Sequence, residues 1–138
     1  MSGQDPSEDE RQGALRSNDA FYRAFAEGDY GAMESLWARA EAVLCVHPGA
    51  GPLHGRDAVM QSWREILARP PQIEHRDARV EIVRGVAFVT CLESVAGRPL
   101  VVTNVFVWEG ARWRLTHHQA SAIAPPAAAR APRSETVH

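Results

Sequence analysis

Lysine is missing altogether from this chain of 138 residues, and arginine supplies all fifteen of its basic side chains. These arginines are dispersed among seventeen acidic residues, so the formal net charge is only -2. A protein that binds nucleic acid gathers its basic residues into a patch that contacts phosphates. Because the basic residues here are dispersed, we expect no nucleic-acid partner.

Long apolar runs are missing as well. No stretch approaches the roughly 20 apolar residues that a helix needs to cross a bilayer. The first ten residues, MSGQDPSEDE, are polar and lack the apolar core of a signal peptide. We therefore expect no membrane partner and a cytoplasmic location.

Cysteine is scarce: the chain has two, Cys45 and Cys91, each inside an apolar run. A free thiol in such a run behaves as a small apolar side chain, which indicates a reducing compartment and no structural disulfide. The two cysteines and the six histidines match no compact zinc-ligand spacing. The glycine-rich segment 49–55 lacks the lysine and hydroxyl residue of a phosphate-binding loop. The sequence predicts neither a metal nor another cofactor.

The length suits one domain. We place this domain at residues 1–123. The remaining residues, 124–138, are rich in alanine and proline and have no apolar period. Such a segment buries too little apolar surface to fold, so we predict a disordered tail.

The first segment has the apolar spacing of a helix. Asp5 suits the N-cap and Pro6 the first helical position, and Glu8 is placed to complete a capping box. Gly28 is a typical residue for the end of this helix.

Two shorter helices are predicted next. Asp29 can cap the first of them, whose apolar face continues through Trp37 to Ala40. The other begins at Arg56, and the two prolines that start at Pro70 must end it, because proline removes a hydrogen-bond donor.

Strand patterns fill the rest of the chain. A short apolar run, 42–46, predicts a strand that is followed by an irregular loop up to Gly55. After the third helix the apolar period changes to two. Turn signals at RG, AGRP and EGA separate four strand-like runs, at 72–83, 86–95, 100–108 and 112–123.

Short connections between these four runs predict an antiparallel meander. The sequence therefore predicts an α+β fold, in which three N-terminal helices pack on a curved, mainly antiparallel sheet. Such a sheet can close against the helices as a cone with an internal pocket, and ligands commonly bind at the mouth of a cavity of this kind.

The loop in VLCVHPGAGPLHG, residues 43–55, raises a question about function. A surface turn requires glycine and proline but has no need of histidine, yet this loop carries His47 and His54. We predict that His47 lies at the mouth of the pocket and that His54 contacts the same ligand.

Several motifs together resemble a known family. They are the helix that ends in EGD, the LW before the first strand, VHP followed by L-HG, the SW of the third helix, TNVF, and the closing W-R-L-T-H-H-Q-A-S. Over residues 17–123 the chain resembles the SnoaL-like branch of the nuclear transport factor 2-like superfamily. The resemblance implies a cone-shaped, commonly dimeric fold, whose members include ketosteroid isomerases, polyketide cyclases, association domains and binding proteins. The fold by itself therefore does not identify a reaction.

The resemblance also bears on His47. In ketosteroid isomerases an aspartate before a proline at the end of the first short strand is the general base, and the VHP motif implies that His47 takes its place. An imidazole can serve as a base near neutral pH. The isomerases also use a tyrosine of the first helix; this chain has Phe21 at that position, and Tyr22 is one residue off. They use in addition an aspartate from a later strand, and the corresponding run here, 100–108, has no carboxylate. These differences argue against the ketosteroid isomerase mechanism.

His117 and His118 are adjacent in the last strand, so alternation points them to opposite faces. The family pattern favours His118 as the histidine that faces the pocket, and the other is a candidate ligand contact or a dimer contact. Strict alternation predicts two sets of residues with a shared face: Trp113, Leu115, His117 and Gln119 in one set, and Arg114, Thr116, His118 and Ala120 in the other.

Polar side chains inside apolar strands are further candidates. Either Thr103 or Asn104 faces inward, and a buried Asn104 amide needs a partner in backbone, histidine or ligand. Glu93 is the only carboxylate in its strand. If it faces inward it can pair with a histidine, and if it faces outward it is solvated.

Aromatic residues complete the predicted ligand contacts. Trp37 and Trp63 lie on apolar helix faces, where such side chains form either the core or a cavity wall. Tyr22 adds a hydroxyl to the same apolar environment.

Three functions remain open. The protein is an isomerase, cyclase or dehydratase of a small hydrophobic or polyketide-like molecule, with His47 and His118 as acid and base. Alternatively it sequesters such a ligand without catalysis. In the third reading it is an association module, because the run 100–108 is apolar on both faces and thus predicts a homodimer through the outer sheet face.

Overall fold

A computed structural model describes residues 6–124, over which the chain forms three helices and six strands. The helices are α1 (Glu8–Glu27), α2 (Tyr30–Leu36) and α3 (Arg56–Ala68). The strands are β1 (Leu44–Val46), β2 (Pro52–His54), β3 (Ile73–Val83), β4 (Val86–Val95), β5 (Arg98–Glu109) and β6 (Arg112–Ala122). The predicted tail, 124–138, lies outside the described residues except for its first residue.

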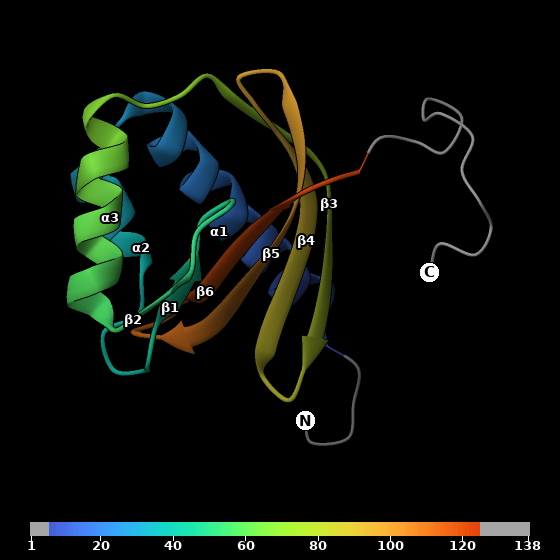
Figure 1. Cartoon of the computed structure of the whole chain (residues 1–138). Helices are drawn as coiled ribbons and strands as arrows, with labels where there is room; N and C mark the ends of the chain where they lie inside the picture. Colours follow the sequence, from blue (N-terminus) through green and yellow to red (C-terminus); the bar gives the residue numbers. More distant parts are fainter. Residues whose placement is uncertain (1–5, 125–138) are drawn as a thin grey trace, which may run out of the picture.

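The strands form one sheet in the order β2-β1-β6-β5-β4-β3. β1 runs parallel to β6, and the other neighbouring pairs are antiparallel. Figure 1 shows the long strands curving past α1, with α2 and α3 on the same side of the sheet. This arrangement confirms the predicted α+β fold, because three helices cover the concave face of a curved, mainly antiparallel sheet.

Two-residue turns join β3, β4, β5 and β6, at the positions that the turn signals predicted. Both central residues of each turn have a positive φ. This geometry matches the right-handed twist of the flanking strands, and one glycine in each turn adopts it without a steric cost. The pairs are Arg84 and Gly85, Ala96 and Gly97, and Gly110 and Ala111.

Helix α1 begins at Glu8, two residues later than the predicted start near Pro6. Its N-cap is Ser7, whose side chain accepts a hydrogen bond from the Glu10 amide at 3.1 Å. The Glu10 carboxylate in turn accepts from the Ser7 amide at 2.8 Å. Serine with glutamate three residues later satisfies both amides, so the capping box uses Glu10 rather than Glu8. The helix ends at Gly28, which has a φ of 66°, as predicted.

The segment after α2 differs from the prediction. Asp29 caps α2 as expected, but the helix ends at Leu36, and Trp37 is extended, with φ -91° and ψ 144°. Arg56 holds this segment, because its guanidinium donates to the carbonyl oxygens of Trp37 at 3.0 Å and Ala38 at 2.9 Å. Trp37 is therefore held by contacts with α3 and with Leu115 of β6, to which it is bridged in parallel, rather than by helical hydrogen bonds.

The loop before α3 is more regular than predicted. Pro52–His54 forms β2, which pairs with β1 in antiparallel register. Pro52 is the first residue of this strand at the sheet edge, a position that tolerates the missing backbone N–H of proline.

Strand β6 contains a bulge that changes which side chains share a face. Val105 pairs with His117 and Phe106 pairs with Leu115, which leaves Thr116 without a partner on β5. An extra residue of this kind interrupts the alternation of side chains. The predicted sets of residues with a shared face are therefore wrong. The side chains of β6 that are buried are Trp113, Leu115, His118 and Ala120.

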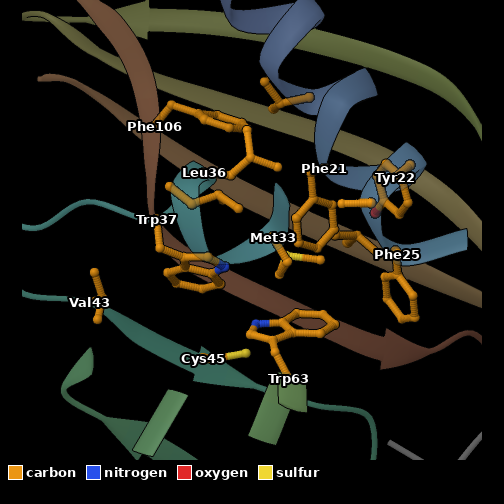
Figure 2. Packing of buried hydrophobic residues seen from close by; sticks show 14 of the residues in the cluster. Phe21, Tyr22, Phe25, Met33, Leu36, Trp37, Val43, Cys45, Trp63 and Phe106 are labelled. Atoms are coloured by element: carbon orange, nitrogen blue, oxygen red, sulfur yellow. The ribbon is translucent and has the colours of Figure 1, made fainter. Parts of the chain in front are cut away.

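The core lies between the helices and the concave face of the sheet (Figure 2). It is rich in aromatic residues, and Trp37, Trp63 and Phe21 are among its largest fully buried side chains. Phe21 meets the ring of Trp63 edge to face, with ring centroids 5.5 Å apart. Edge-to-face contacts of this kind add stability beyond the burial of apolar area.

Candidate functional site

Three buried polar side chains form a row from β6 through β5 to α1. Nδ1 of His118 lies 2.6 Å from Oδ1 of Asn104, and Nδ2 of Asn104 donates to Oδ1 of Asn18 at 2.8 Å. Each of the three residues is at most 1% exposed. An amide oxygen accepts hydrogen bonds but does not donate them, so Nδ1 of His118 carries the proton. The row thus defines both the tautomer and the orientation of the His118 ring.

His118 is uncharged at neutral pH. Burial lowers the pKa of its imidazole to about 3, and the neighbouring His47 and His117 add to this effect. Since Nδ1 carries the proton, Nε2 of the neutral ring carries the lone pair. His118 therefore presents one nitrogen with a lone pair in the interior of the protein.

His47 follows β1 and bonds to α3. Its Nε2 lies 2.9 Å from Oγ of Ser62. The Ser62 hydroxyl donates its only proton to the Val59 carbonyl at 2.6 Å, so it accepts from His47. The neutral His47 ring therefore carries its proton at Nε2 and its lone pair at Nδ1. Burial lowers the pKa of this histidine too.

The two imidazoles are neighbours, with ring centroids 6.2 Å apart. The Trp63 ring packs against both of them: its centroid lies 4.9 Å from the centroid of His47 and 5.7 Å from that of His118. A proton on one imidazole disfavours a proton on the other, because like charges at short range repel. The pair can therefore hold one proton during a reaction but resists holding two.

A second polar group joins α1 to β4 and β3. The Tyr22 hydroxyl donates to the Glu93 carboxylate and lies 3.4 Å from Sγ of Cys91. The Tyr22 ring stacks on His75, with centroids 4.2 Å apart and ring planes 12° from parallel. Nε2 of His75 lies 3.2 Å from Oδ1 of Asp19. Glu93 thus faces inward, and its partner is a tyrosine rather than a histidine.

Burial sets the protonation of this second group. It raises the pKa of Glu93, and the hydrogen bond from Tyr22 opposes part of that rise. Burial, together with the charge of Glu93, raises the pKa of Tyr22 far above its usual value of 10.0. Tyr22 therefore stays protonated and donates to Glu93.

Two of the predicted site residues lie apart from this interior. His54 is exposed on the edge strand β2. His117 is half-buried and, as the neighbour of His118 along β6, points to the convex face of the sheet. The other predicted residues face the interior: His47, His118, Tyr22, Trp37, Trp63, Glu93 and Asn104.

Sequence reasoning missed several partners of these residues. Asn18 shares the apolar face of α1 with Ala14 and Phe21, and a buried amide at that spacing signals an unidentified partner. Ser62 and His75 gave no comparable signal, because their roles depend on elements that are distant in the sequence.

A groove that we call the Trp108 groove lies near the first half of α1, away from the histidines. Its volume is about 750 Å³. Trp108 is 59% exposed there, and its ring meets Trp113 nearly at a right angle with centroids 5.5 Å apart. The lining includes the charged side chains of Asp9, Glu10, Arg16 and Arg112.

Within residues 6–124 no three histidine, cysteine or acidic side chains gather as a metal ion would require. No helix in this part of the chain combines the length and apolar character needed to cross a bilayer. Both cysteines are buried and free.

Comparison with known proteins identifies the family. Residues 15–125 match the SnoaL-like domain family, so the chain belongs to this family. A proposed dehydratase of the NTF2-like family from Streptomyces avermitilis is 32% identical, with a TM-score of 0.78 over 85% of this chain and 98% of that chain. A proposed calcium/calmodulin-dependent protein kinase type II association domain from Thiobacillus denitrificans is 28% identical, with a TM-score of 0.70 over 80% of this chain and 94% of that chain. Members of this superfamily thus carry names from both enzymatic and associative classes.

A plant protein is also similar. F-box protein SKIP8 of Arabidopsis thaliana is 28% identical over an alignment of 110 residues, which covers 77% of this chain and 48% of that protein. The chain therefore spans about half the length of this curated relative.

Proposed function

We propose that this domain binds a small, largely apolar molecule between α1, α3 and β6 and moves a proton on it through His118 and His47. The observation that carries this proposal is a pair of neighbouring imidazoles, the buried His118 and the half-buried His47, whose ring centroids lie 6.2 Å apart. Each ring bonds a neighbouring side chain through one nitrogen and carries its lone pair on the other. Titratable groups with strongly shifted pKa values gather at functional sites, because burial tunes their affinity for protons.

The surrounding side chains match an apolar ligand with few polar groups. Trp37 and Trp63 supply flat apolar surface, and Asn104 and Tyr22 supply polar atoms that are already held in place by hydrogen bonds. Glu93 orients Tyr22. Sites with mostly apolar walls and a few fixed polar groups are typical of small-molecule binding.

The proposed chemistry is proton transfer within one molecule. Nε2 of His118 accepts a proton from a ligand carbon, and the electrons of that C–H bond stay on the ligand. The proton then returns to another ligand atom in an isomerisation or ring closure, or joins a departing hydroxyl, which leaves as water. His47 lies close enough to share the proton. The S. avermitilis relative, named as a dehydratase, supports this class of reaction.

The test uses 2-tetralone, a flat neutral ketone with acidic α protons, at the head of a panel of cyclic ketones. We expect the protein to accelerate exchange of the α protons in D2O, measured by proton NMR. His118→Gln and His47→Gln should each slow this exchange by about 100-fold or more, the range for loss of a general acid or base. His54→Gln is the matched control, because His54 is exposed and lies apart from the pair.

Circular dichroism of each variant checks that the fold is retained. Absence of accelerated exchange with every ketone of the panel would overturn the catalytic proposal. Binding of a ketone without exchange would instead support the alternative of a ligand-sequestering domain.

The convex face of the sheet favours association of two copies of the chain, which is compatible with the proposed proton transfer. Phe88 and Val101 are 40% and 42% exposed on neighbouring strands, and they pair with Val105 and Leu92. Exposed apolar patches commonly mark protein interfaces. We propose that two copies associate through this face, and the T. denitrificans relative, named as an association domain, agrees with this proposal.

Native mass spectrometry of the purified protein tests the association. We expect a mass of two chains, and a further mass that denaturation releases would also identify a retained ligand. Phe88→Glu should give single chains. Ala58→Glu adds the same charge on the exposed side of α3 and should leave the dimer intact. A wild-type protein that is monomeric at micromolar concentration would contradict the proposal.

A further inference from the structure

The Trp108 groove is a cavity that the proposed proton transfer does not use. It lies between the first half of α1 and the turns that join β3 to β4 and β5 to β6, where Gly85 and Ala111 line it. Its volume of about 750 Å³ falls within the range of about 300–1,000 Å³ that is typical of small-molecule sites. The groove is therefore large enough to hold a ligand of its own.

Two tryptophans form the aromatic wall of this groove. Trp113 is 5% exposed, and its carbonyl accepts a hydrogen bond from the Ser17 hydroxyl at 3.1 Å. Its ring packs against α1 at Gly13, where a Cβ would lie 3.2 Å from both Cδ1 and Nε1 of the indole. Trp108 packs against this fixed ring and is itself 59% exposed. A flat ring stacked on Trp108 would bury apolar surface that now faces water, which favours binding.

Two arginines of the groove have no ion-pair partner. Arg16 and Arg112 line the groove, and neither takes part in any ion pair of residues 6–124. The residue opposite Arg112 in the sheet register is Glu109. Its carboxylate instead accepts from the backbone amides of Arg39 at 2.9 Å and Ala40 at 2.8 Å. The two guanidinium groups are therefore available to an anion from outside the chain.

The acidic residues of the groove are balanced within the chain. Asp9 and Glu10 both belong to the first turn of α1. At this end of a helix the free backbone amides and the positive end of the helix dipole stabilise negative charge. The Glu10 carboxylate also accepts from the Ser7 amide at 2.8 Å. The positive charge of the groove is therefore less balanced than its negative charge, which suits an anionic ligand.

The charged and the aromatic parts of the groove are neighbours. A Cβ on Gly13 would lie 3.8 Å from Nη2 of Arg16 and 3.2 Å from Nε1 of Trp113, so the guanidinium stands beside the indole. A guanidinium can bind a carboxylate through two parallel N–H donors. The Trp108 ring follows, with its centroid 5.5 Å from that of Trp113. A ligand whose carboxylate binds Arg16 therefore brings an attached ring system toward the exposed face of the groove at Trp108.

We infer that the Trp108 groove binds a small aromatic carboxylate, whose ring system stacks on Trp108 and whose carboxylate accepts hydrogen bonds from Arg16. Arg112 adds a second positive charge to the site. This binding site is separate from the histidine pair and does not depend on the proposed proton transfer. Guanidinium groups stay protonated and transfer no proton, so the groove recognises its ligand by charge and stacking without changing it.

The first test is an NMR titration of the unmodified protein with 2-naphthoate, a bicyclic aromatic acid that is ionised at neutral pH. The chain has four tryptophans and therefore four indole N–H signals. We expect the signals of Trp108 and Trp113 to move as 2-naphthoate binds, while those of Trp37 and Trp63 stay in place. Movement confined to the two core tryptophans would place the ligand in the interior and overturn the inference. Signals that do not move at millimolar concentrations would overturn it too.

The second test changes the charge of the probe and keeps its ring system. 2-Naphthalenemethanol is neutral, and 2-naphthylmethylammonium is a cation. We expect 2-naphthoate to bind about tenfold more tightly than the alcohol, because hydrogen bonds to a charged group are the stronger ones, and the cation to bind most weakly. Equal affinities would show that stacking alone is responsible and would overturn the carboxylate contact. Tightest binding of the cation would show that Asp9 and Glu10 dominate the groove, and would overturn it as well.

Substitution gives a third, independent measurement. Arg16→Gln and Arg112→Gln should each weaken binding of 2-naphthoate about two- to fivefold, the range for exposed ion pairs, and leave binding of the alcohol unchanged. Trp108→Ala should weaken binding of both probes. Arg23→Gln removes the same charge from an exposed position of α1 outside the groove and is the matched control.

All four of these side chains are exposed, so each variant should fold, and circular dichroism checks this. An Arg16→Gln variant that loses no more affinity for 2-naphthoate than Arg23→Gln does would contradict the carboxylate contact. Unchanged affinity in Trp108→Ala would contradict the stacking. Neither result would bear on the histidine pair, whose test is α-proton exchange.

Discussion

The interior around His118 and the Trp108 groove lie along different halves of α1 and differ in nearly every physical respect. The interior is closed, and its polar side chains are bonded to one another in rows. The groove is open, with a volume of about 750 Å³, and its lining carries four charged side chains. Trp63 in the interior is fully buried, whereas Trp108 in the groove is 59% exposed.

The comparison teaches that open volume and chemical capacity are separate properties. The groove offers space, but its charged side chains are in contact with water. The interior offers two imidazoles whose pKa values burial lowers, and indole donors that have no partner among the described residues. Burial therefore locates the candidate site better than the size of a hollow does.

The largest expected effect on stability comes from replacing Trp63 in the interior, compared with Trp108 in the groove. Trp63→Ala should lower the free energy of unfolding by about 3–5 kcal/mol, because it leaves a cavity in a packed core. Trp108→Ala should lower it by about 1 kcal/mol or less, because most of that side chain is already in water. Urea denaturation measures both values. Similar losses in the two variants would contradict the contrast between interior and groove.

The row of polar side chains predicts the next effect. Asn104→Ala leaves Nδ1 of His118 and Oδ1 of Asn18 buried without a partner, and we expect a loss of about 2–4 kcal/mol in the free energy of unfolding. Thr103→Ala, one residue away on the convex face, is the matched control and should cost about 1 kcal/mol or less. Nitrogen NMR of the wild type should show His118 with its proton on Nδ1, and the opposite tautomer would contradict the assigned row.

The smallest effect is a dependence of stability on pH. The pKa of His118 is about 3 in the folded protein and near 6.5 when the chain is unfolded, so between these values only the unfolded chain binds the proton. The contribution of His118 to the free energy of unfolding is therefore fully present above about pH 6.5 and decreases as the pH falls through this window. At pH 5 the loss from this one group should be about 2 kcal/mol.

Urea denaturation at pH 7 and pH 5 checks this expectation. The wild type should lose more stability on acidification than His118→Gln, and His54→Gln should behave like the wild type. Glu93, whose pKa is raised, acts in the opposite direction, but it is present in all three proteins and cancels in the difference. An equal loss in wild type and His118→Gln would show that His118 is not buried and neutral.

Much of the fold could be predicted because its signals are local. The three two-residue turns, the end of α1 at Gly28 and the cap of α2 at Asp29 each depend on a few consecutive residues. The start of α1 was misplaced by two residues, because both Asp5-Pro6 and Ser7 with Glu10 are plausible caps in the sequence. Only the hydrogen bonds of the folded chain distinguish them.

The candidate site was predictable only in part. The inward-facing candidates included Asn104 and His118, and both are buried. Their partners were not predictable, because Asn18 and Asn104 are separated by 86 positions in the chain. The bulge at Thr116 was missed for the same reason, since it exists only in the pairing of β6 with β5.

The sequence by itself determined the order of helices and strands, the turns between them and the set of residues able to carry chemistry. These follow from backbone sterics and hydrogen bonds between near neighbours in the chain. Tertiary structure alone decided that His118 bonds Asn104, that Tyr22 rather than a histidine meets Glu93, and that the indole donors of Trp37 and Trp63 have no partner within residues 6–124. The reason is physical: exclusion of water and the pairing of polar atoms depend on packing between segments that are distant in the sequence.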